Sequence, residues 1–398
     1  MSLISVEDAY DIVQSQAKDF GIEVVPLNKG IGRVLREDWT CDRDLPPYNR
    51  VTMDGVAINY EGAMGRSELL IESVIGAGDP EGKLINPSHC AEIMTGAMLP
   101  IGADTIVRYE DVSILDGSAQ INVPFKKNQN IHWKGQDRSQ GDLIVPTGTL
   151  LSASEIGVGA SIGRHKIKVS KLPKTIVIST GDELVNIDEI PAPHQIRRSN
   201  VYRMEATLRH LGIPIDTAHL KDDKEEIIKQ LNEFLVTHDL IILSGGVSKG
   251  KFDFLPEALE ACGVQKLFHK IAQRPGKPMW FGNHDNGTTV FALPGNPVSS
   301  FMCLTIYAID WLRMSVGLSP HDRPKAVLNE DIAFKPDLTY FLEVKLSYDN
   351  QGHIIATPKK GNGSGDLANL LNGDAFIRLP QDKTEFKKGE VYSIYRYR

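Results

Sequence analysis

The sequence predicts a multidomain fold that joins a doubly wound, mostly parallel α/β domain to β-rich parts. At 398 residues the chain exceeds the length that one ordinary hydrophobic core supports. Between residues 172 and 318, short apolar runs alternate with amphipathic helical patterns, which is typical of a parallel sheet covered on both faces. Elsewhere, Gly- and Pro-rich turns separate short β-type runs, so the other parts are expected to be mainly β.

Two capping signatures predict helices in an N-terminal, partly extended domain. Ser5 with Asp8 precedes apolar residues at helical spacing in residues 5–20, and Ser152 with Glu155 begins a second helical pattern. From about 40 to 140 no long helix is evident. The expected domains are 1–39 with 138–171 (elongated, discontinuous), 40–137 (β-rich), 172–318 (α/β) and 319–398 (a small β-barrel-like domain).

The elements of the α/β domain follow in order along the chain. The apolar runs "KTIVIST", "DLIILSGG" and "TTVFAL" are predicted strands. The segments "SNVYRMEATLRHL", "KEEIIKQLNEFLVTH", "FLPEALEAC" and "NPVSSFMCLTIYAIDWLRMS" are predicted helices. Beyond them, Leu342, Val344, Leu346 and Tyr348 alternate with polar residues, which predicts a half-buried strand in the C-terminal domain. "GEVYSIYRY" alternates in the same way near the C-terminal end of the sequence.

Composition excludes several classes of protein. With 41% hydrophobic and 24% charged residues and no apolar run of membrane-spanning length, the chain is expected to be globular and not membrane-bound. A formal net charge of −7 disfavours nucleic-acid binding. The acidic first ten residues do not resemble a secretory leader, and the cysteines show no CxxC spacing, so we expect a cytoplasmic protein without a zinc site or disulfide scaffold.

The stretch "SGGVSKGKFDF", residues 244–254, has the outline of a phosphate-binding P-loop. Gly245, Gly250 and Lys251 have the required spacing, but Phe252 stands where the P-loop carries a metal-binding hydroxyl. A nucleotide P-loop, a plain glycine turn and another kind of phosphate site all fit this pattern. Because the loop follows a predicted strand, its backbone N–H groups can approach an anion closely.

Two further loops follow predicted strands, at the edge where open α/β sheets bind ligands. In "STGDELV", Asp182 and Glu183 are hard oxygen donors suited to Mg²⁺ or to a positioned water, although Asp182 could equally cap the next helix. In "ALPGNPVSSF", Asn296 is the expected N-cap and Pro297 the first helical residue. Such a stiff loop serves either as a binding surface or as a rigid connector.

Other polar residues are informative only in combination. In "QRPGKPMWFG", Arg274 and Lys277 flank a Pro-Gly turn, which favours an oxyanion clamp in an acidic chain. Four residues lie in Gly-containing turns and would each indicate ordinary turn chemistry if taken alone: Asp54, Thr95, Asp137 and Ser364.

These motifs together resemble those of the molybdopterin molybdenumtransferase family, which includes bacterial MoeA proteins and the E domain of gephyrin. The resemblance runs from end to end and rests on "MDG", "MTGAMLP", "GADTIVRYED", "GQDRSQGDLIVPTGTLLSASEIG", "STGDEL", "SGGVSKGKFDF", "RPGKP", "LPGNPVS" and "GSGDLANL". It implies Mg²⁺-dependent insertion of molybdate into adenylylated molybdopterin, with release of AMP. It also implies a homodimer and a transient contact with the molybdopterin adenylyltransferase.

The resemblance assigns roles to residues of this chain. It gives the catalytic set as Asp54, Thr95, Asp137, Glu183, Asp222 and Asp253, and the metal-binding set as Asp182, Glu183 and Asp253. With the loop residues above, it gives the substrate-binding set as Ser244, Gly245, Gly246, Ser248, Arg274, Lys277, Pro294, Asn296, Pro297 and Ser364.

The chain departs from the family pattern at a few positions. Glu343 stands where members often carry an arginine thought to meet molybdate, Arg274 replaces the usual lysine, and Arg198 stands where aspartate is frequent. "PPYNRVT" replaces a run that usually resembles "PPFDNSA". The alternative function is a non-catalytic or divergent pterin- or nucleotide-binding module of the same superfamily.

Overall fold

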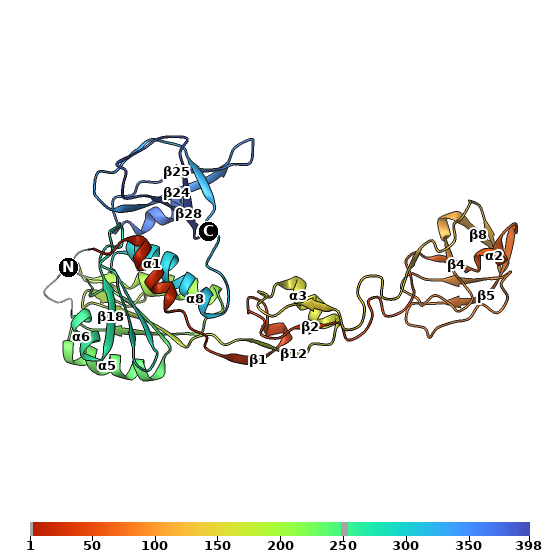
Figure 1. Ribbon diagram of the computed structural model, residues 1–398, viewed down its shortest axis with the longest axis horizontal. Coiled ribbons are helices and arrows are strands. Elements are labelled where there is room, and N and C mark those ends of the chain that lie inside the picture. The colour runs from red at the N-terminus through yellow and green to blue at the C-terminus, as the bar shows by residue number, and fades with distance from the viewer. Residues whose placement is uncertain (1–2, 248–253) are drawn as a thin grey trace. The chain divides into compact units, whose positions relative to one another are not determined.

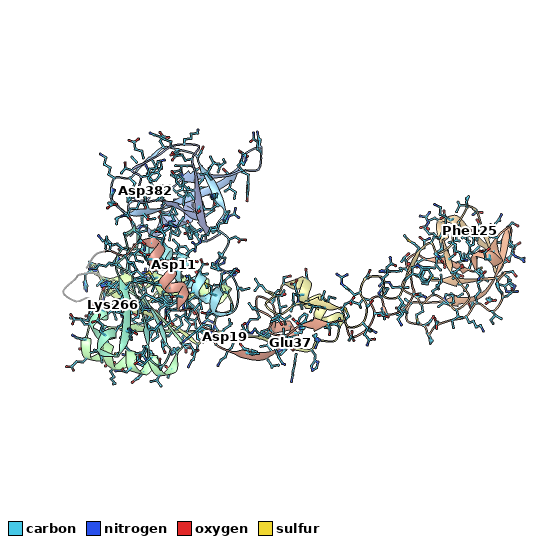
Figure 2. All side chains as sticks on the ribbon, in the orientation of Figure 1. Asp11, Asp19, Glu37, Phe125, Lys266 and Asp382 are labelled. Carbon is cyan, nitrogen blue, oxygen red and sulfur yellow. The ribbon has the colours of Figure 1, made fainter. Side chains whose placement is uncertain are left out.

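The computed structural model describes residues 3–247 and 254–398 (Figures 1 and 2). The chain forms two compact units, each described below by itself. The first comprises Met1–Val24, Gly30–Arg36 and Lys168–Arg398, and the second comprises Val25–Lys29 and Glu37–Ile167. The division into four domains remains a prediction.

The first unit contains the expected doubly wound sheet. Its strands lie in the order β16 (Ile215–Leu220), β13 (Thr175–Thr180), β17 (Leu240–Ser244), β21 (Thr289–Leu293), β20 (Trp280–His284) and β18 (Val264–His269). The first four run parallel, and β20 and β18 are antiparallel to their neighbours. Every residue of β13, β17 and β21 is buried, as expected for strands with both faces covered.

Helices cover both faces of this sheet (Figure 1). Ile242 belongs to a core shared with α1 (Val6–Ser15), α4 (Ser199–His210), α7 (Pro297–Cys303) and α8 (Ile309–Ser315). Its neighbour Ile241 belongs to the core under α5 (Lys224–Thr237) and α6 (Leu255–Ala261). The Ser5 hydroxyl accepts the Asp8 N–H at 3.0 Å, which confirms the predicted cap of α1.

The segment predicted as one helix after Asn296 is helical throughout but changes its hydrogen-bond pattern. The π-helical segment η3 (Leu304–Ala308) lies between α7 and α8. Within it, the Thr305 hydroxyl donates to the Phe301 carbonyl at 2.8 Å and so competes for the acceptor of a regular helical turn. Residue spacing alone did not distinguish this bulge from a continuous α-helix.

The C-terminal part of the first unit is a closed barrel, which confirms the expected fold. Its strands follow the order β24 (Thr339–Tyr348), β25 (Ile354–Pro358), β22 (Lys325–Leu328), β28 (Val391–Arg396) and β26 (Ala375–Leu379), and β26 pairs back to β24. Smaller elements are η4 (Leu367–Asn372) and the strand pairs β14 (Leu184–Val185) with β15 (Ile196–Arg197) and β23 (Ile332–Ala333) with β27 (Glu385–Phe386).

The predicted alternation along β24 is only partly right. Leu342 and Val344 are buried as expected, but Glu343 between them is also buried, at 7% exposure, and Tyr348 is 66% exposed. The first half of β24 is covered on both sides because η4 packs against it, and β19 (Gln273–Arg274) pairs with it in parallel. This pairing brings the loop that carries Arg274 and Lys277 beside the barrel.

The second unit is β-rich with short helices. Its main sheet has the order β7 (Thr105–Arg108), β4 (Gly55–Ile58), β6 (Cys90–Ile93), β5 (Glu68–Ile75), β9 (Ser118–Ile121) and β8 (Val112–Leu115). The short pairs are β3 (Arg50–Val51) with β10 (Ile131–His132) and β2 (Trp39–Thr40) with β11 (Leu143–Val145). Its helical elements are η1 (Leu27–Lys29), α2 (Tyr60–Ala63), η2 (Tyr109–Asp111) and α3 (Ala153–Ser161), and the Ser152–Glu155 capping box of α3 is present.

The remaining pair, β1 (Ile22–Pro26) with β12 (Lys166–Ser170), contains points at which the chain passes from one unit to the other. The four cysteines are free thiols and all are buried. Across residues 3–247 and 254–398, no helix has both the length and the apolar character needed to cross a bilayer.

Candidate functional site

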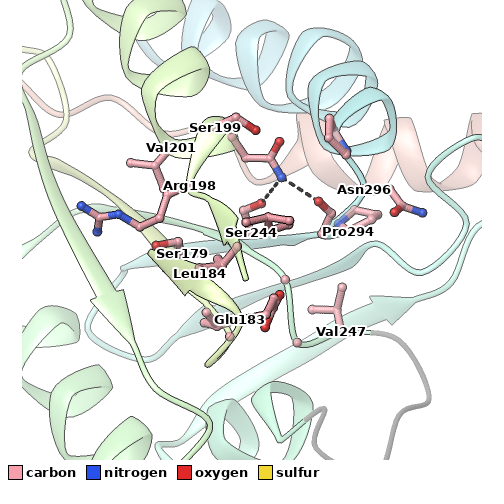
Figure 3. Close-up of a pocket in the computed structure, with 18 of the residues that line it drawn as sticks. Ser179, Glu183, Leu184, Arg198, Ser199, Val201, Ser244, Val247, Pro294 and Asn296 are labelled. Carbon is pink, nitrogen blue, oxygen red and sulfur yellow. Dashed lines mark hydrogen bonds between the residues drawn. The ribbon is translucent and has the colours of Figure 1, made fainter. Parts of the chain in front are cut away.

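A cavity of about 620 Å³ lies where β13, β17 and β21 end (Figure 3). This is the carboxyl edge of the parallel strands, where open α/β sheets bind ligands. Its walls come from the loops that follow the three strands, from the loop after β16, from β14 and β15, and from the start of α4. Residues of these walls include Thr180, Glu183, Arg198, Asn200, Asp222, Ser244, Gly245, Gly246, Pro294, Asn296 and Pro297.

A second cavity of about 360 Å³ adjoins the first, since Pro278, Pro294 and Asn296 line both. The second cavity lies between the Pro-Gly loop after β19, the start of α7 and the barrel. Its lining includes Arg274, Lys277, Ser299, Tyr340, Glu343 and Ser364. The cavity that contains the two expected cations therefore shares a wall of the proline loop with the first cavity, although Arg274 and Lys277 do not line the first cavity.

The Ser244-Gly245-Gly246 turn can form only with glycine. Gly245 has φ +109° and Gly246 has φ +65°, and a Cβ at Gly245 would lie 2.8 Å from Thr180 Oγ1. One expectation needs correction: the Gly245 N–H donates to the Leu293 carbonyl at 3.1 Å, so it is already engaged. Thr180 Oγ1 is buried and has no partner in the described part of the chain, which leaves it as a candidate ligand group.

Asn200, at the start of α4, was missed by the sequence analysis. Its Nδ2 donates to Ser244 Oγ at 3.0 Å and to the Gly295 carbonyl at 2.7 Å, as the dashed lines in Figure 3 show. The Asn200 amide is held in turn by Arg203, whose Nη2 donates to Asn200 Oδ1 at 3.1 Å. In the sequence, an asparagine at a helix start indicates only a cap, so its contacts with two other loops left no signal.

Asp182, after β13, and Asp222, after the neighbouring strand β16, are joined by two reciprocal hydrogen bonds. The Asp182 N–H donates to Asp222 Oδ2 at 3.3 Å, and the Asp222 N–H donates to Asp182 Oδ1 at 3.2 Å. The capping alternative for Asp182 is wrong, because the next element is β14, and Arg198 occupies the N-cap of α4. Glu183 lies in the cavity wall beside Asp222.

Charge at this edge is mixed. Arg198 donates through Nη2 to Asn186 Oδ1. Behind the wall, His219 Nδ1 lies 2.9 Å from Ser179 Oγ. Burial, together with the positive charge of Arg198, lowers the pKa of His219, which favours a neutral imidazole at this edge.

The acids at this edge include possible ligands for a metal ion. Asp182 and Glu183 offer the oxygen ligands that Mg²⁺ prefers. Across residues 3–247 and 254–398, however, no three His, Cys, Asp or Glu side chains gather in a way that could hold a metal ion. Two predicted site residues, Ser248 and Asp253, lie outside the described residues. The described side chains by themselves therefore do not form a metal site.

The loop before α7 is hydrogen-bonded to the loop that precedes η4, and so links the α/β domain to the barrel. Asn296 is the N-cap residue and Pro297 the first helical residue, as predicted. The Asn296 side chain does not cap the helix, however, and its Nδ2 donates instead to Ser364 Oγ at 2.9 Å. Pro294, Pro297 and Ser364 thus lie together with Asn296 around the wall between the cavities.

Three predicted site residues belong to the second unit. The Thr95 N–H donates to Asp54 Oδ1 at 2.6 Å. This bond, together with the one from the Thr95 hydroxyl, holds the pKa of Asp54 below its usual value. Asp137 accepts from His132 at 2.9 Å. Asp54 and Thr95 therefore form a local pair, and both acids have the partners that turn chemistry would give them.

The chain matches three sequence families along nearly its whole length. Residues 4–163 match the MoeA N-terminal region (domain I and II), 176–314 a probable molybdopterin binding domain, and 325–397 the MoeA C-terminal region (domain IV). A relative from Synechocystis sp. called molybdopterin molybdenumtransferase is 39% identical over 99% of this chain and 100% of its own.

A relative of the same name from Staphylococcus aureus (strain Mu50) is 31% identical over 98% of this chain and 95% of its own. A crystal structure of a molybdopterin biosynthesis MoeA protein from Pyrococcus horikoshii superposes with a TM-score of 0.83 at 29% identity, covering 100% of both chains.

Proposed function

The chain belongs to the molybdopterin molybdenumtransferase family, and we propose that it inserts molybdate into adenylylated molybdopterin, releasing AMP in an Mg²⁺-dependent reaction. Family membership makes it a transferase of molybdenum cofactor biosynthesis. The observation that supports the detailed reaction is the pair of adjoining cavities with Pro278, Pro294 and Asn296 in common. One cavity suits a phosphate-bearing substrate and the other a small oxyanion.

The first cavity supplies neutral donors and fixed backbone for a phosphate-bearing substrate. Ser244 and Thr180 offer hydroxyl groups, and the glycine turn lets a ligand approach the backbone. Asn200 ties this turn to the loop before α7, so the donors are held in place before substrate arrives. Preorganised donors stabilise developing negative charge without reorganisation during the reaction.

The second cavity supplies positive charge for the oxyanion. Arg274 and Lys277 come from one constrained Pro-Gly turn, and Ser299 and Ser364 add hydroxyl groups. Guanidinium and ammonium groups form charge-assisted hydrogen bonds with oxyanions. Because the two cavities share a wall, molybdate bound in the second would lie next to pterin bound in the first, and group transfer between them requires such proximity.

Glu183 and Asp222, in the wall of the first cavity, are proposed to act on the adenylate, where cleavage of a phosphoanhydride needs an oriented water more than a protein nucleophile. Asp54, Thr95, Asp137 and Asp253 are proposed to take part in the same reaction, with Asp253 and Asp182 assisting Glu183 in binding Mg²⁺. The active form is proposed to be a homodimer that receives its substrate from the molybdopterin adenylyltransferase.

AMP release tests this function directly. Purified full-length protein is supplied with adenylylated molybdopterin, molybdate and Mg²⁺, and AMP and metallated cofactor are measured by chromatography. AMP and cofactor should appear together and only when Mg²⁺ is present. Absence of both products with folded protein and intact substrate would refute the proposed reaction.

A variant of Glu183 separates this enzyme from a module that only binds pterin. Glu183→Gln should bind the pterin but lose at least about a hundredfold in the rate of AMP release, as expected for loss of a positioned acid or base. Glu233→Gln, on the exposed side of α5, removes the same charge outside both cavities and should react like wild type. Pterin binding by all three proteins without AMP release from any of them would favour the binding module.

A further inference from the structure

A buried carboxyl group lies in the wall of the cavity that carries Arg274 and Lys277. Glu343, on β24, is 7% exposed and lines this cavity. Among the described residues, no Lys, Arg or His nitrogen is within ion-pair distance of its carboxyl group. A buried carboxylate usually has a cationic partner, so this arrangement calls for a physical explanation.

The groups around Glu343 come from several elements. Arg274 and Lys277 lie across the cavity on the Pro-Gly loop. The Asn369 side chain of η4, which donates to the Lys359 carbonyl at 2.7 Å, lies near the Glu343 carboxyl group, and the negative charge of Asp366 opposes that of Glu343. Tyr340 on the same strand and Tyr397 near the last strand complete the set of titratable neighbours. No histidine lines the part of this cavity that the structure describes.

These surroundings favour the protonated carboxyl group. Burial, with a contribution from Asp366, raises the pKa of Glu343 above its usual value, although the Glu343 backbone N–H and the Asn369 side chain oppose the shift. A protonated carboxyl group can donate a hydrogen bond to an anion in the cavity. The ionised group cannot donate, and its charge repels a dianion held by the two cations.

We propose that Glu343 sets the oxyanion affinity of the second cavity, donating a hydrogen bond to a tetrahedral dianion when protonated and repelling it when ionised. This inference deepens the proposed function, on which it rests for the identity of the physiological oxyanion. Binding by itself is a property of the cavity and can be measured without the pterin. Affinity is highest below the pKa of Glu343 and falls as the pH rises through it.

Sulfate binding to the full-length protein tests the proposal, because sulfate remains a dianion between about pH 5 and pH 8. Equilibrium dialysis should show wild-type affinity falling about tenfold as the pH rises through the pKa of Glu343. Glu343→Gln keeps the shape of the side chain and an N–H donor, so it should bind at every pH as tightly as wild type does at low pH. Molybdate titrations at the upper end of the range should show the same gain.

The matched control is Glu385→Gln, which removes one charge from β27 outside the cavity and should follow the wild-type profile. A flat wild-type profile overturns the proposal, as does a Glu343→Gln profile that still falls with pH. Because the wild-type profile decides by itself, the test survives if the variant fails to fold. If sulfate affinity depends on pH as described but no AMP is released, the proposed function is refuted and this inference stands. If AMP is released but sulfate affinity does not depend on pH, this inference is refuted and the proposed function stands.

Discussion

Asn296 and Ser364 join the two parts of the first unit across the wall between the cavities. Asn296 Nδ2 donates to Ser364 Oγ at 2.9 Å, and the Val298 N–H donates to the Ser364 carbonyl at 3.0 Å. The first residues of α7 are thus tied to the loop before η4 by two bonds. One residue, Ser364, fixes the position of the barrel loop against the proline loop and also lines the second cavity.

Replacing Asn296 with Ala should loosen this wall. We expect a rise of about fivefold in the KM for molybdate, since one hydrogen bond contributes about 1 kcal/mol. Ser364→Ala should have a similar effect, and the double variant should cost less than the sum of the two because they share one bond. Strictly additive effects in this cycle would show that the bond does not act in binding.

Replacing Gly181 with Ala should displace Glu183. Gly181 has φ +132°, and an added Cβ would lie 2.4 Å from Glu183 Oε2. We expect the rate of AMP release to fall at least about tenfold, because an oriented acid near the substrate must move. Gly163→Ala is the matched control, since Gly163 also has positive φ, at +75°, but open space around it. A control that loses as much activity as Gly181→Ala would point to backbone strain instead.

Removing the side chain of Asn200 should loosen the first cavity without touching an acid. Asn200→Ala loses the bonds to Ser244 Oγ and to the Gly295 carbonyl. We expect pterin affinity to fall about tenfold or more, because the two loops lose their common donor. Ser244→Ala removes one of these bonds and also the hydroxyl group that is proposed to bind substrate, so it should weaken pterin binding as well. Pterin binding unchanged in both variants would contradict a positioning role.

A buried ionic network away from both cavities should make stability pH-dependent. Asp310, only 3% exposed, accepts hydrogen bonds from Tyr10, His321 and Arg323. Burial raises the pKa of Asp310, but the bonds from His321, Arg323 and Tyr10 outweigh it and lower the pKa to about 2. Because the folded pKa lies below the unfolded one, this stabilisation is complete above about pH 4 and is lost as the pH falls towards 2.

Asp310→Asn should therefore lower the free energy of unfolding at neutral pH by about 2 kcal/mol or more. Urea unfolding at several pH values would measure it. The difference between wild type and variant should shrink as the pH falls below about 4, provided both proteins remain folded there. A difference that stays constant over this range would show that the charge of Asp310 is not what stabilises the fold.

Local pattern was sufficient for the helices of the α/β domain, for α1 and α3, and for three strands of the doubly wound sheet, but not for β16, β18 and β20. Ser5 with Asp8, and Ser152 with Glu155, mark helix starts that the structure contains, because a cap uses atoms only three residues apart. Periodicity also located β13 and β17. It failed at Glu343, because burial there depends on η4, which is distant along the sequence but packs against the same strand.

In the candidate site, too, the features set by local sequence were predictable and those set by distant segments were not. The order of glycine and proline loops after predicted strands was enough to place Ser244, Gly245, Pro294 and Asn296 at one edge of the sheet, since parallel strands end together. The bonds of Asn200 to two other loops, and of Asn296 to Ser364, could not be predicted. They join segments with no local signal in common.

By itself, the sequence determined the buried strands β13, β17 and β21, the helices that alternate with them and the family to which the chain belongs. Tertiary structure alone decided which polar groups are already bonded, as at Gly245, which buried hydroxyl lacks a described partner, as at Thr180, and which acid is buried in a cavity wall, as at Glu343. The physical reason is the distance along the chain between the groups that interact. Turns and caps are set by neighbouring residues, whereas burial and hydrogen-bond satisfaction depend on every segment that packs around a group.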